Sequence, residues 1–263
     1  MDLETQVSQM QTPVSTEEKI AELARMFVQS SGKERRIMEK NMEMDRKTLL
    51  EAAHARHSVR QYTDRAIEPE KRADLSDFIA QINAKAGTHI QILYDEPCCF
   101  DSLMAHYGKF TGVKNYIALV GKKSADLDRT LGYWGEAVVL YAQALGLNSC
   151  WVAMTHGKSR AVVVPGEKQV CLIALGYGST QGTAHTSKPV SELSSGENVP
   201  DWFRSGMETA QLAPTAMNQQ KFWFSFEPDG KVKAVSGSGF YTKLDLGIAQ
   251  YHFELGSGKK ISG

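Results

Sequence analysis

The chain has 263 residues, of which 42% are hydrophobic and 23% charged, an ordinary composition for a globular protein with one or two cores. Its 30 basic and 30 acidic residues cancel, so composition excludes the one-sided charge that attracts nucleic acid or anionic membranes. No apolar run approaches the roughly 20 residues that cross a bilayer, and we expect a cytoplasmic protein without a membrane partner.

The first 44 residues are expected to form a helical extension in front of the main domain, 45–263. Residues 1–12 are polar and lack the apolar centre of a signal peptide. Further on, Ser15-Thr16-Glu17-Glu18 resembles a capping box in front of apolar residues at helical spacing. The apolar face would pack on the main domain or on a second subunit, and a partly disordered extension is the alternative.

From residue 45 onward, helical and strand patterns mix without strict alternation, which predicts an α+β fold. Apolar periodicity predicts helices over 45–55, 69–85, 126–145, 201–212 and 245–253. Strands are predicted over 88–94, 116–120, 150–153, 169–175, 220–226 and 232–235. The last two strands would form a hairpin across Asp229-Gly230, and 178–200 would be a long polar loop.

The segment after the first helix of this domain, Arg56-His57-Ser58-Val59-Arg60, suits a phosphate group. Arginine offers a planar fork of donors that pairs with phosphate oxygens and keeps its charge. Ser58 adds a neutral donor between the two arginines. A solvated helix end with ordinary charges is the alternative.

A second candidate segment is the turn Ala213-Pro214-Thr215-Ala216-Met217-Asn218-Gln219-Gln220, between a predicted helix and a predicted strand. Small residues let backbone N–H groups approach a ligand closely, and Asn and Gln amides offer both a donor and an acceptor. These groups suit the edge of a heterocycle. The alternative is a structural turn, in which Pro214 stops the helix and Asn218 caps the next element.

Together these segments make the chain resemble the nitroreductase family of FMN-dependent oxidoreductases. Two further segments carry the resemblance. The end of the family's central helix and the following strand resemble Ala144-Leu145-Gly146-Leu147-Asn148-Ser149-Cys150-Trp151. The family's late core strand resembles Leu172-Ile173-Ala174-Leu175-Gly176-Tyr177-Gly178. The resemblance implies a nitroreductase-like α+β fold with a mixed or antiparallel sheet flanked by helices.

The chain departs from the common family pattern in the order of its motifs. The turn usually follows the arginine segment within a few tens of residues, but here it lies near the C-terminus, as in a rearranged branch of nitroreductases. The usual Gln-Pro-Trp becomes Gln220-Lys221-Phe222, and Thr215 stands where the family has Ser. These changes leave FMN binding as the expectation and leave the substrate open.

The resemblance also implies which residues contact FMN. The residues implied at the phosphate are Arg56 and Ser58, with Lys259 and Lys260 from the C-terminus, for which a frayed tail is the alternative. His57, between Arg56 and Ser58, is also expected to bind the cofactor. Those implied along the ring are Arg60 at the N1/O2 edge, Trp151, Met154 and Thr155 near N5, and Pro214, Thr215, Ala216, Asn218 and Gln220 on the turn. A core aromatic is the alternative for Trp151.

The implied activity is that of an FMN-dependent reductase. NAD(P)H would reduce FMN, and an electron-poor small molecule such as a nitroaromatic or quinone would then take the electrons in a ping-pong cycle. The alternatives are a flavin-binding carrier or redox sensor without robust turnover, or reductive dehalogenation or flavin cleavage at the same site. The family habit implies a homodimer with shared sites, although the rearranged order could let one chain complete its own site.

The cysteines and histidines show no metal-binding spacing. We expect reduced thiols at Cys98, Cys99, Cys150 and Cys171, the last two as small core residues. The seven histidines are expected at the surface or as caps.

Overall fold

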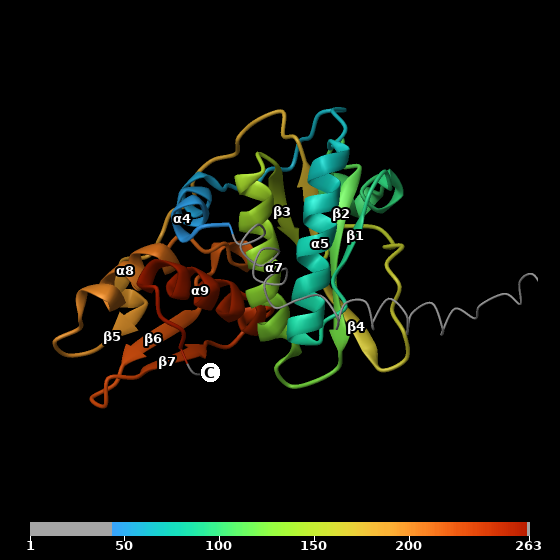
Figure 1. Cartoon of the computed structure of the whole chain (residues 1–263). Coiled ribbons are helices and arrows are strands. Elements are labelled where there is room, and N and C mark those ends of the chain that lie inside the picture. The colour runs from blue at the N-terminus through green and yellow to red at the C-terminus, as the bar shows by residue number, and fades with distance from the viewer. Residues whose placement is uncertain (1–43, 262–263) are drawn as a thin grey trace, which may run out of the picture. The chain divides into compact units, whose positions relative to one another are not determined.

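The computed structural model describes residues 44–261, so the expected helical extension lies outside the described residues except for its last residue. Figure 1 shows the order of the helices and strands. They are α4 (Arg46–Ala55), α5 (Pro69–Ala86), β1 (Gln91–Leu93), η1 (Pro97–Cys99), α6 (Leu103–Tyr107), β2 (Asn115–Lys122), α7 (Leu127–Ala144), β3 (Asn148–Val152), β4 (Glu167–Gly176), η2 (Val190–Glu192), β5 (Ser194–Ser195), α8 (Asp201–Ala210), η3 (Ala216–Asn218), β6 (Phe222–Phe226), β7 (Val232–Ser236) and α9 (Thr242–Ser257).

The strands of the described chain form two sheets. The larger has the order β1-β2-β4-β3, and every pair in it is antiparallel. The smaller has the order β5-β6-β7, in which β5 is parallel and β7 antiparallel to β6. Helices α5 and α7 lie beside the larger sheet, and α8 and α9 lie beside the smaller one (Figure 1). The predicted α+β fold with an antiparallel sheet flanked by helices is confirmed.

Helices α7 and α9 cross at close range, and glycines make this approach possible. A Cβ atom on Gly132 of α7 would lie 2.1 Å from the carbonyl oxygen of Leu244, and one on Gly247 of α9 would lie 2.0 Å from that of Arg129. Real Cβ atoms do not come so near to backbone oxygens. The crossing therefore holds α7, which lies beside the larger sheet, close against α9, which lies beside the smaller one.

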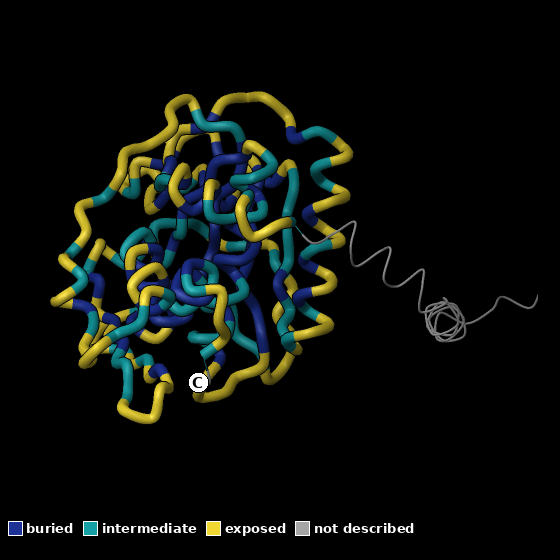
Figure 2. Tube along the Cα trace, turned by 60° about the vertical axis from the view of Figure 1, so that its left-hand side comes forward, coloured by how far each residue is buried: buried dark blue, intermediate teal, exposed yellow. Residues whose placement is uncertain are grey.

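Buried apolar residues form three clusters, which run through the interior (Figure 2). Successive residues of β2 point to opposite faces of the sheet, so Ile117 and Leu119 join the cluster under α7 while Tyr116 joins the cluster on the other face. The third cluster packs α8 and α9 on the smaller sheet through Phe203, Phe224 and Phe253. Cys150 and Cys171 are buried, as predicted, and all four cysteines are free.

Several predicted bounds differ from the observed elements; the last helix, predicted over 245–253, spans Thr242–Ser257. The strand predicted over 88–94 is regular only at Gln91–Leu93, with an isolated bridge between Thr88 and Gly121 before it. Between them, the side chain of Asn83 accepts from the backbone N–H of Ile90 and donates to its carbonyl oxygen, both at 2.8 Å, which takes up the backbone groups of Ile90. The loop predicted over 178–200 contains η2 and the two-residue strand β5. A pair of serines carries no strand pattern, so β5 was not predictable from residue type.

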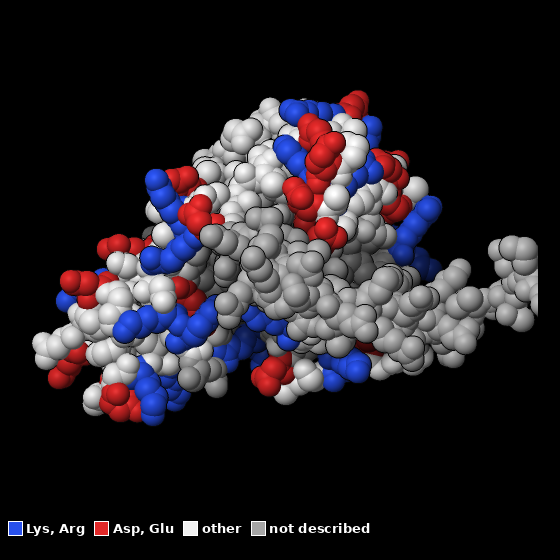
Figure 3. All heavy atoms as spheres, viewed as in Figure 1, with Lys and Arg blue, Asp and Glu red and all other residues white. Residues whose placement is uncertain are grey.

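The surface agrees with the balanced composition. Basic and acidic side chains lie next to one another on the face shown in Figure 3. Within residues 44–261, no helix combines the length and the apolar character that crossing a membrane requires.

Candidate functional site

The segment Arg56–Arg60 connects the end of α4 to the edge of the larger sheet. Asp45 caps the start of α4 by accepting from the backbone N–H groups of Lys47 and Thr48, and Arg56 ends the helix in an extended conformation. The backbone N–H of Val59 then donates to the carbonyl oxygen of Ser149 at 3.0 Å, next to a parallel bridge between Ser58 and Ser149. These contacts fix the segment against β3.

Arg56 itself is buried rather than solvated. Its side chain is 2% exposed, and its Nε atom lies 3.9 Å from Oε1 of Glu136 on α7. Within the described residues, Arg56 Nε and Nη1 have no hydrogen-bond partner, and neither does the hydroxyl of Ser149. The solvated helix end is therefore wrong for Arg56. Arg60 is exposed, with its guanidinium 5.9 Å from the centre of the Phe110 ring.

Glu136 is the centre of a buried polar network. Both its side chain and that of His252 are 0% exposed, and His252 Nε2 lies 2.9 Å from Glu136 Oε1. The indole N–H of Trp151 donates to Glu136 Oε2 at 2.9 Å. A buried carboxylate is tolerated only when it is paired and hydrogen-bonded, and here three elements supply its partners. The expectation that every histidine lies at the surface or caps an element is wrong for His252.

The second candidate segment, 213–220, forms a tight turn that α9 holds from one side. Within it, the backbone N–H of Gln220 donates to the hydroxyl of Thr215 at 3.0 Å. Asp245 of α9 accepts from the backbone N–H of Ala216 at 3.0 Å and from the side-chain amide of Gln219 at 2.7 Å. The turn is therefore defined by contacts on both its backbone and its side chains.

The loop 178–200 forms hydrogen bonds with both candidate segments. At its start, the carbonyl oxygen of Gln181 lies 3.3 Å from Nδ1 of His57. Further along, the carbonyl oxygen of Thr186 accepts from the side-chain amides of Asn218 and Gln220, both at 2.9 Å. The sequence predicted both segments as candidates, but no residue type in it indicated that the loop between them would bond to both.

His185 in the same loop lies close to several cationic or titratable side chains. Its Nε2 atom lies 3.0 Å from the carbonyl oxygen of Gln211. Burial is the main cause that lowers the pKa of His185, and positive charge on Arg56, His252 and His57 lowers it further, against the opposing effect of the Gln211 carbonyl. The charge of Arg56 therefore acts on the loop as well as on Glu136.

Comparison with known proteins assigns the family. The chain matches the family described as "Putative TM nitroreductase" over residues 48–257, which is most of its length. It belongs to that nitroreductase family. The resemblance inferred from the sequence motifs is thereby confirmed.

One solved nitroreductase structure supports the fold of this family member. A putative nitroreductase from Thermotoga maritima is 23% identical and superposes with a TM-score of 0.58, covering 81% of this chain and 85% of that one. A putative nitroreductase in complex with FMN from Desulfovibrio desulfuricans is 19% identical with a TM-score of 0.43, covering 55% and 93%. A search of curated proteins found no match. At 23% identity the superposition on the Thermotoga structure shows the fold alone.

In this nitroreductase-family chain, the residues expected near N5 of a flavin lie at and beyond the end of β3. Trp151 is half-buried, so it is partly the core aromatic of the alternative interpretation. Its indole N–H also donates to the carboxylate of Glu136. Met154 is 70% exposed. Thr155 packs so tightly on Gly108 that a Cβ atom there would lie 2.6 Å from the Cβ atom of Thr155.

The two C-terminal lysines have partners of their own. Lys259 Nζ lies 4.3 Å from the centre of the Trp202 ring, and Lys260 Nζ lies 2.7 Å from a carboxylate oxygen of Glu254. Arg46, the first residue of α4, donates from Nε to the carbonyl oxygen of Leu255 at 2.7 Å. These partners of the two lysines lie on α8 and α9, and neither belongs to the Arg56–Arg60 segment.

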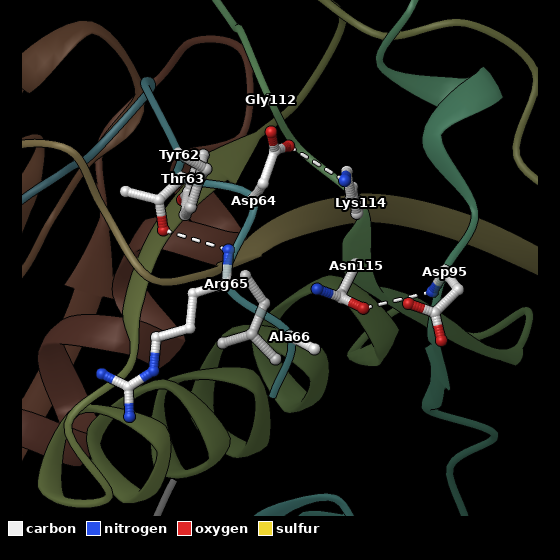
Figure 4. A pocket seen from close by; sticks show the side chains of 11 residues that line it. Tyr62, Thr63, Asp64, Arg65, Ala66, Asp95, Gly112, Lys114 and Asn115 are labelled. Carbon is white, nitrogen blue, oxygen red and sulfur yellow. Dashed lines mark hydrogen bonds and ion pairs between the residues drawn. The ribbon is translucent and has the colours of Figure 1, made fainter. Parts of the chain in front are cut away.

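A small cavity is lined by the residues that follow the Arg56–Arg60 segment in the chain. It has a volume of about 150 Å³, and its lining includes residues 62–66, Gly112, Lys114 and Asn115. Its charged lining is paired: Asp64 and Lys114 point toward each other at 2.9 Å (Figure 4). The volume is below the roughly 300–1,000 Å³ typical of sites for larger organic ligands, so this cavity does not accommodate a flavin ring.

Proposed function

We propose that this nitroreductase-family chain binds FMN and is an oxidoreductase that passes electrons from NAD(P)H to an electron-poor small molecule, such as a nitroaromatic or a quinone, in a ping-pong cycle. FMN would supply the redox chemistry, and the chain supplies binding, electrostatics and access. The observation that carries the proposal is the loop 178–200, which bonds to both the Arg56–Arg60 segment and the 213–220 turn.

The Arg56 end of this arrangement fits the phosphate of FMN. Arg56 Nε and Nη1 and the hydroxyl of Ser149 lack partners among the described residues, and phosphate oxygens are strong acceptors for such groups. Arg56 has its carboxylate partner only at 3.9 Å, so an anion would gain from its charge. Arg60 adds an exposed cation at the other end of the segment.

The turn fits the ring end of FMN. The side-chain amides of Asn218 and Gln220 are held by Thr186, and Gln220 also accepts from the backbone N–H of Lys188 at 2.8 Å. These contacts give the turn a fixed shape before any ligand arrives, which lowers the entropic cost of binding. Met217, fully exposed on the turn, offers apolar surface to a planar ring.

We propose that one chain completes its own site. The partners of His57 and Asn218 are Gln181 and Thr186, five residues apart, and five residues span at most about 18 Å. That separation is within the length of one extended FMN molecule. A homodimer with shared sites is the alternative that the family habit suggests.

Complementation separates the two arrangements. Chains carrying Arg56→Ala and chains carrying Asn218→Ala are mixed under conditions that allow subunit exchange, and bound FMN is measured. A self-contained site leaves every site with one lesion, so FMN binding stays low. Recovery toward half of the wild-type value would instead establish a site shared between two chains.

Anaerobic kinetics test the activity. NADH and NADPH are each mixed with the FMN-loaded protein, and flavin bleaching is followed before a nitroaromatic or a quinone is added. The proposal predicts bleaching by one of the nucleotides, reoxidation by the acceptor, and parallel double-reciprocal lines in the steady state. Bound FMN that neither nucleotide reduces would favour the carrier or sensor over the enzyme.

A further inference from the structure

The turn 213–220 has an unusual backbone. Met217, Asn218 and Gln220 have φ angles of 53°, 53° and 46°, in the left-handed region that non-glycine residues rarely occupy. Three such residues within four positions cost backbone free energy, and the conformation persists only where surrounding contacts impose it. A side chain outside the turn must therefore help to hold it.

Asp245 is the side chain best placed to do so. It lies in the first turn of α9, is 1% exposed, and accepts from the backbone of Ala216 with one carboxylate oxygen and from the side chain of Gln219 with the other. Gln219 also donates to the carbonyl oxygen of Phe240, which ties the turn to the start of α9. Both carboxylate oxygens of Asp245 are thus used on the turn.

We propose that Asp245 is a positioning residue, which as an anion holds the turn 213–220 in the shape that binds flavin, so that protonation of Asp245 weakens flavin binding. The inference rests on the proposed FMN site. A carboxylate accepts two hydrogen bonds from the turn, whereas a carboxylic acid must carry a proton on one oxygen. Protonation removes the charge and makes one oxygen a weaker acceptor, so the bonds from Ala216 and Gln219 are weakened.

The surroundings place this change in an accessible pH range. Burial raises the pKa of Asp245 to about 6, against the lowering effect of its bonds to Ala216 and Gln219. Asp245 takes part in no ion pair among the described residues. The titratable groups that face Asp245 are the thiol of Cys171 on β4 and, next to that thiol, the hydroxyl of Tyr241. Burial raises the pKa of both groups, so both are neutral at pH 6.

The sign of the effect on folding is opposite to that on binding. A carboxyl whose pKa is raised by folding binds its proton more tightly in the folded state, so its contribution to stability is greatest below pH 4 and is lost as the pH rises toward 6. Flavin binding, by contrast, needs the ionised form. Lowering the pH from 7 to 5 should therefore strengthen this part of the fold while weakening FMN binding about tenfold, since one proton must leave for each flavin bound.

The test compares FMN dissociation constants from pH 5 to 8 in wild type and in Asp245→Asn, read from quenching of flavin fluorescence. Asp201→Asn is the matched control, because Asp201 is also a first-turn carboxylate but is exposed on α8. The phosphate of FMN itself titrates near pH 6. That contribution is common to all three proteins and cancels in their ratios.

Asp245→Asn should bind FMN about tenfold more weakly than wild type at pH 7 and lose the excess pH dependence, whereas Asp201→Asn should keep it. Without flavin, the amide hydrogen of Ala216 should exchange faster in Asp245→Asn. If Asp245→Asn does not fold, Gln219→Leu serves instead: it removes one donor, so the midpoint of the pH dependence should move upward. An unchanged pH profile in these variants overturns the role of Asp245 while leaving the FMN site intact, and wild-type protein that binds no FMN at any pH contradicts the proposed function itself.

Discussion

Replacing Glu136 by Gln tests how the buried network holds the interior together. The substitution keeps the shape of the side chain but removes the charge and turns one acceptor into a donor. That donor would face the indole N–H of Trp151 or the ring nitrogen of His252, now 2.9 Å from a carboxylate oxygen. A hydrogen bond to a charged group contributes about 1.5–3 kcal/mol. Arg56 would also lose its carboxylate, although at 3.9 Å that interaction is a modest one.

We therefore expect Glu136→Gln to lower the free energy of unfolding by about 2–3 kcal/mol. With a urea dependence of about 2–3 kcal/mol per molar, the midpoint should fall by about 1 M. Glu51→Gln is the control, because Glu51 pairs with Lys47 at 4.0 Å on an exposed face of α4 and should contribute less than about 1 kcal/mol. A Glu136→Gln protein as stable as wild type, or more stable, would mean that the cost of burying the charge exceeds what its partners return.

Three further predictions concern Arg56, Gly247 and the cysteines. Arg56→Ala should weaken FMN binding about tenfold to a hundredfold. Because Arg56 is buried beside Glu136, the substitution should also lower the urea midpoint of the flavin-free protein. An unchanged midpoint would show that Arg56 does not stabilise the fold. Gly247→Ala should destabilise the chain by more than about 2 kcal/mol, measured by thermal unfolding, because its Cβ atom would lie 2.0 Å from the Arg129 carbonyl oxygen; a small effect would mean that α7 and α9 can separate. A thiol reagent at pH 8 should label exposed Cys98 within minutes and leave Cys171 unmodified, because burial raises the pKa of Cys171 to about 12. Mass spectrometry checks both sites. Early labelling of Cys171 would contradict its burial.

The helices were predictable because their apolar residues repeat at helical spacing, and α7 is the clearest case. That periodicity could not predict that Glu136 is the centre of a buried polar network. A carboxylate within a helix as apolar as α7 was the available signal for a buried network, since such a group needs a partner. The partner, His252, lies 116 residues further on. No neighbouring residue in the sequence distinguishes it from a histidine at the surface.

The candidate segments were predictable for a different reason, since their residue types state a chemistry before any fold is known. Arg56-His57-Ser58-Val59-Arg60 shows donors for an anion, and 213–220 shows small residues with amides. The loop that joins them contributes through backbone carbonyl oxygens of Gln181 and Thr186, which any residue could supply. Backbone contacts leave no trace in residue type, so the sequence could not predict this connection.

The central claim is that this chain binds FMN through the Arg56–Arg60 segment and the 213–220 turn. The most direct measurement is the visible absorbance spectrum of the purified protein, followed by reconstitution of flavin-free protein with FMN, with FAD and with riboflavin. We predict a yellow protein that releases FMN on heating, takes up FMN in preference to riboflavin because of the phosphate, and loses that preference in Arg56→Ala. A colourless protein that FMN cannot reconstitute would contradict the account.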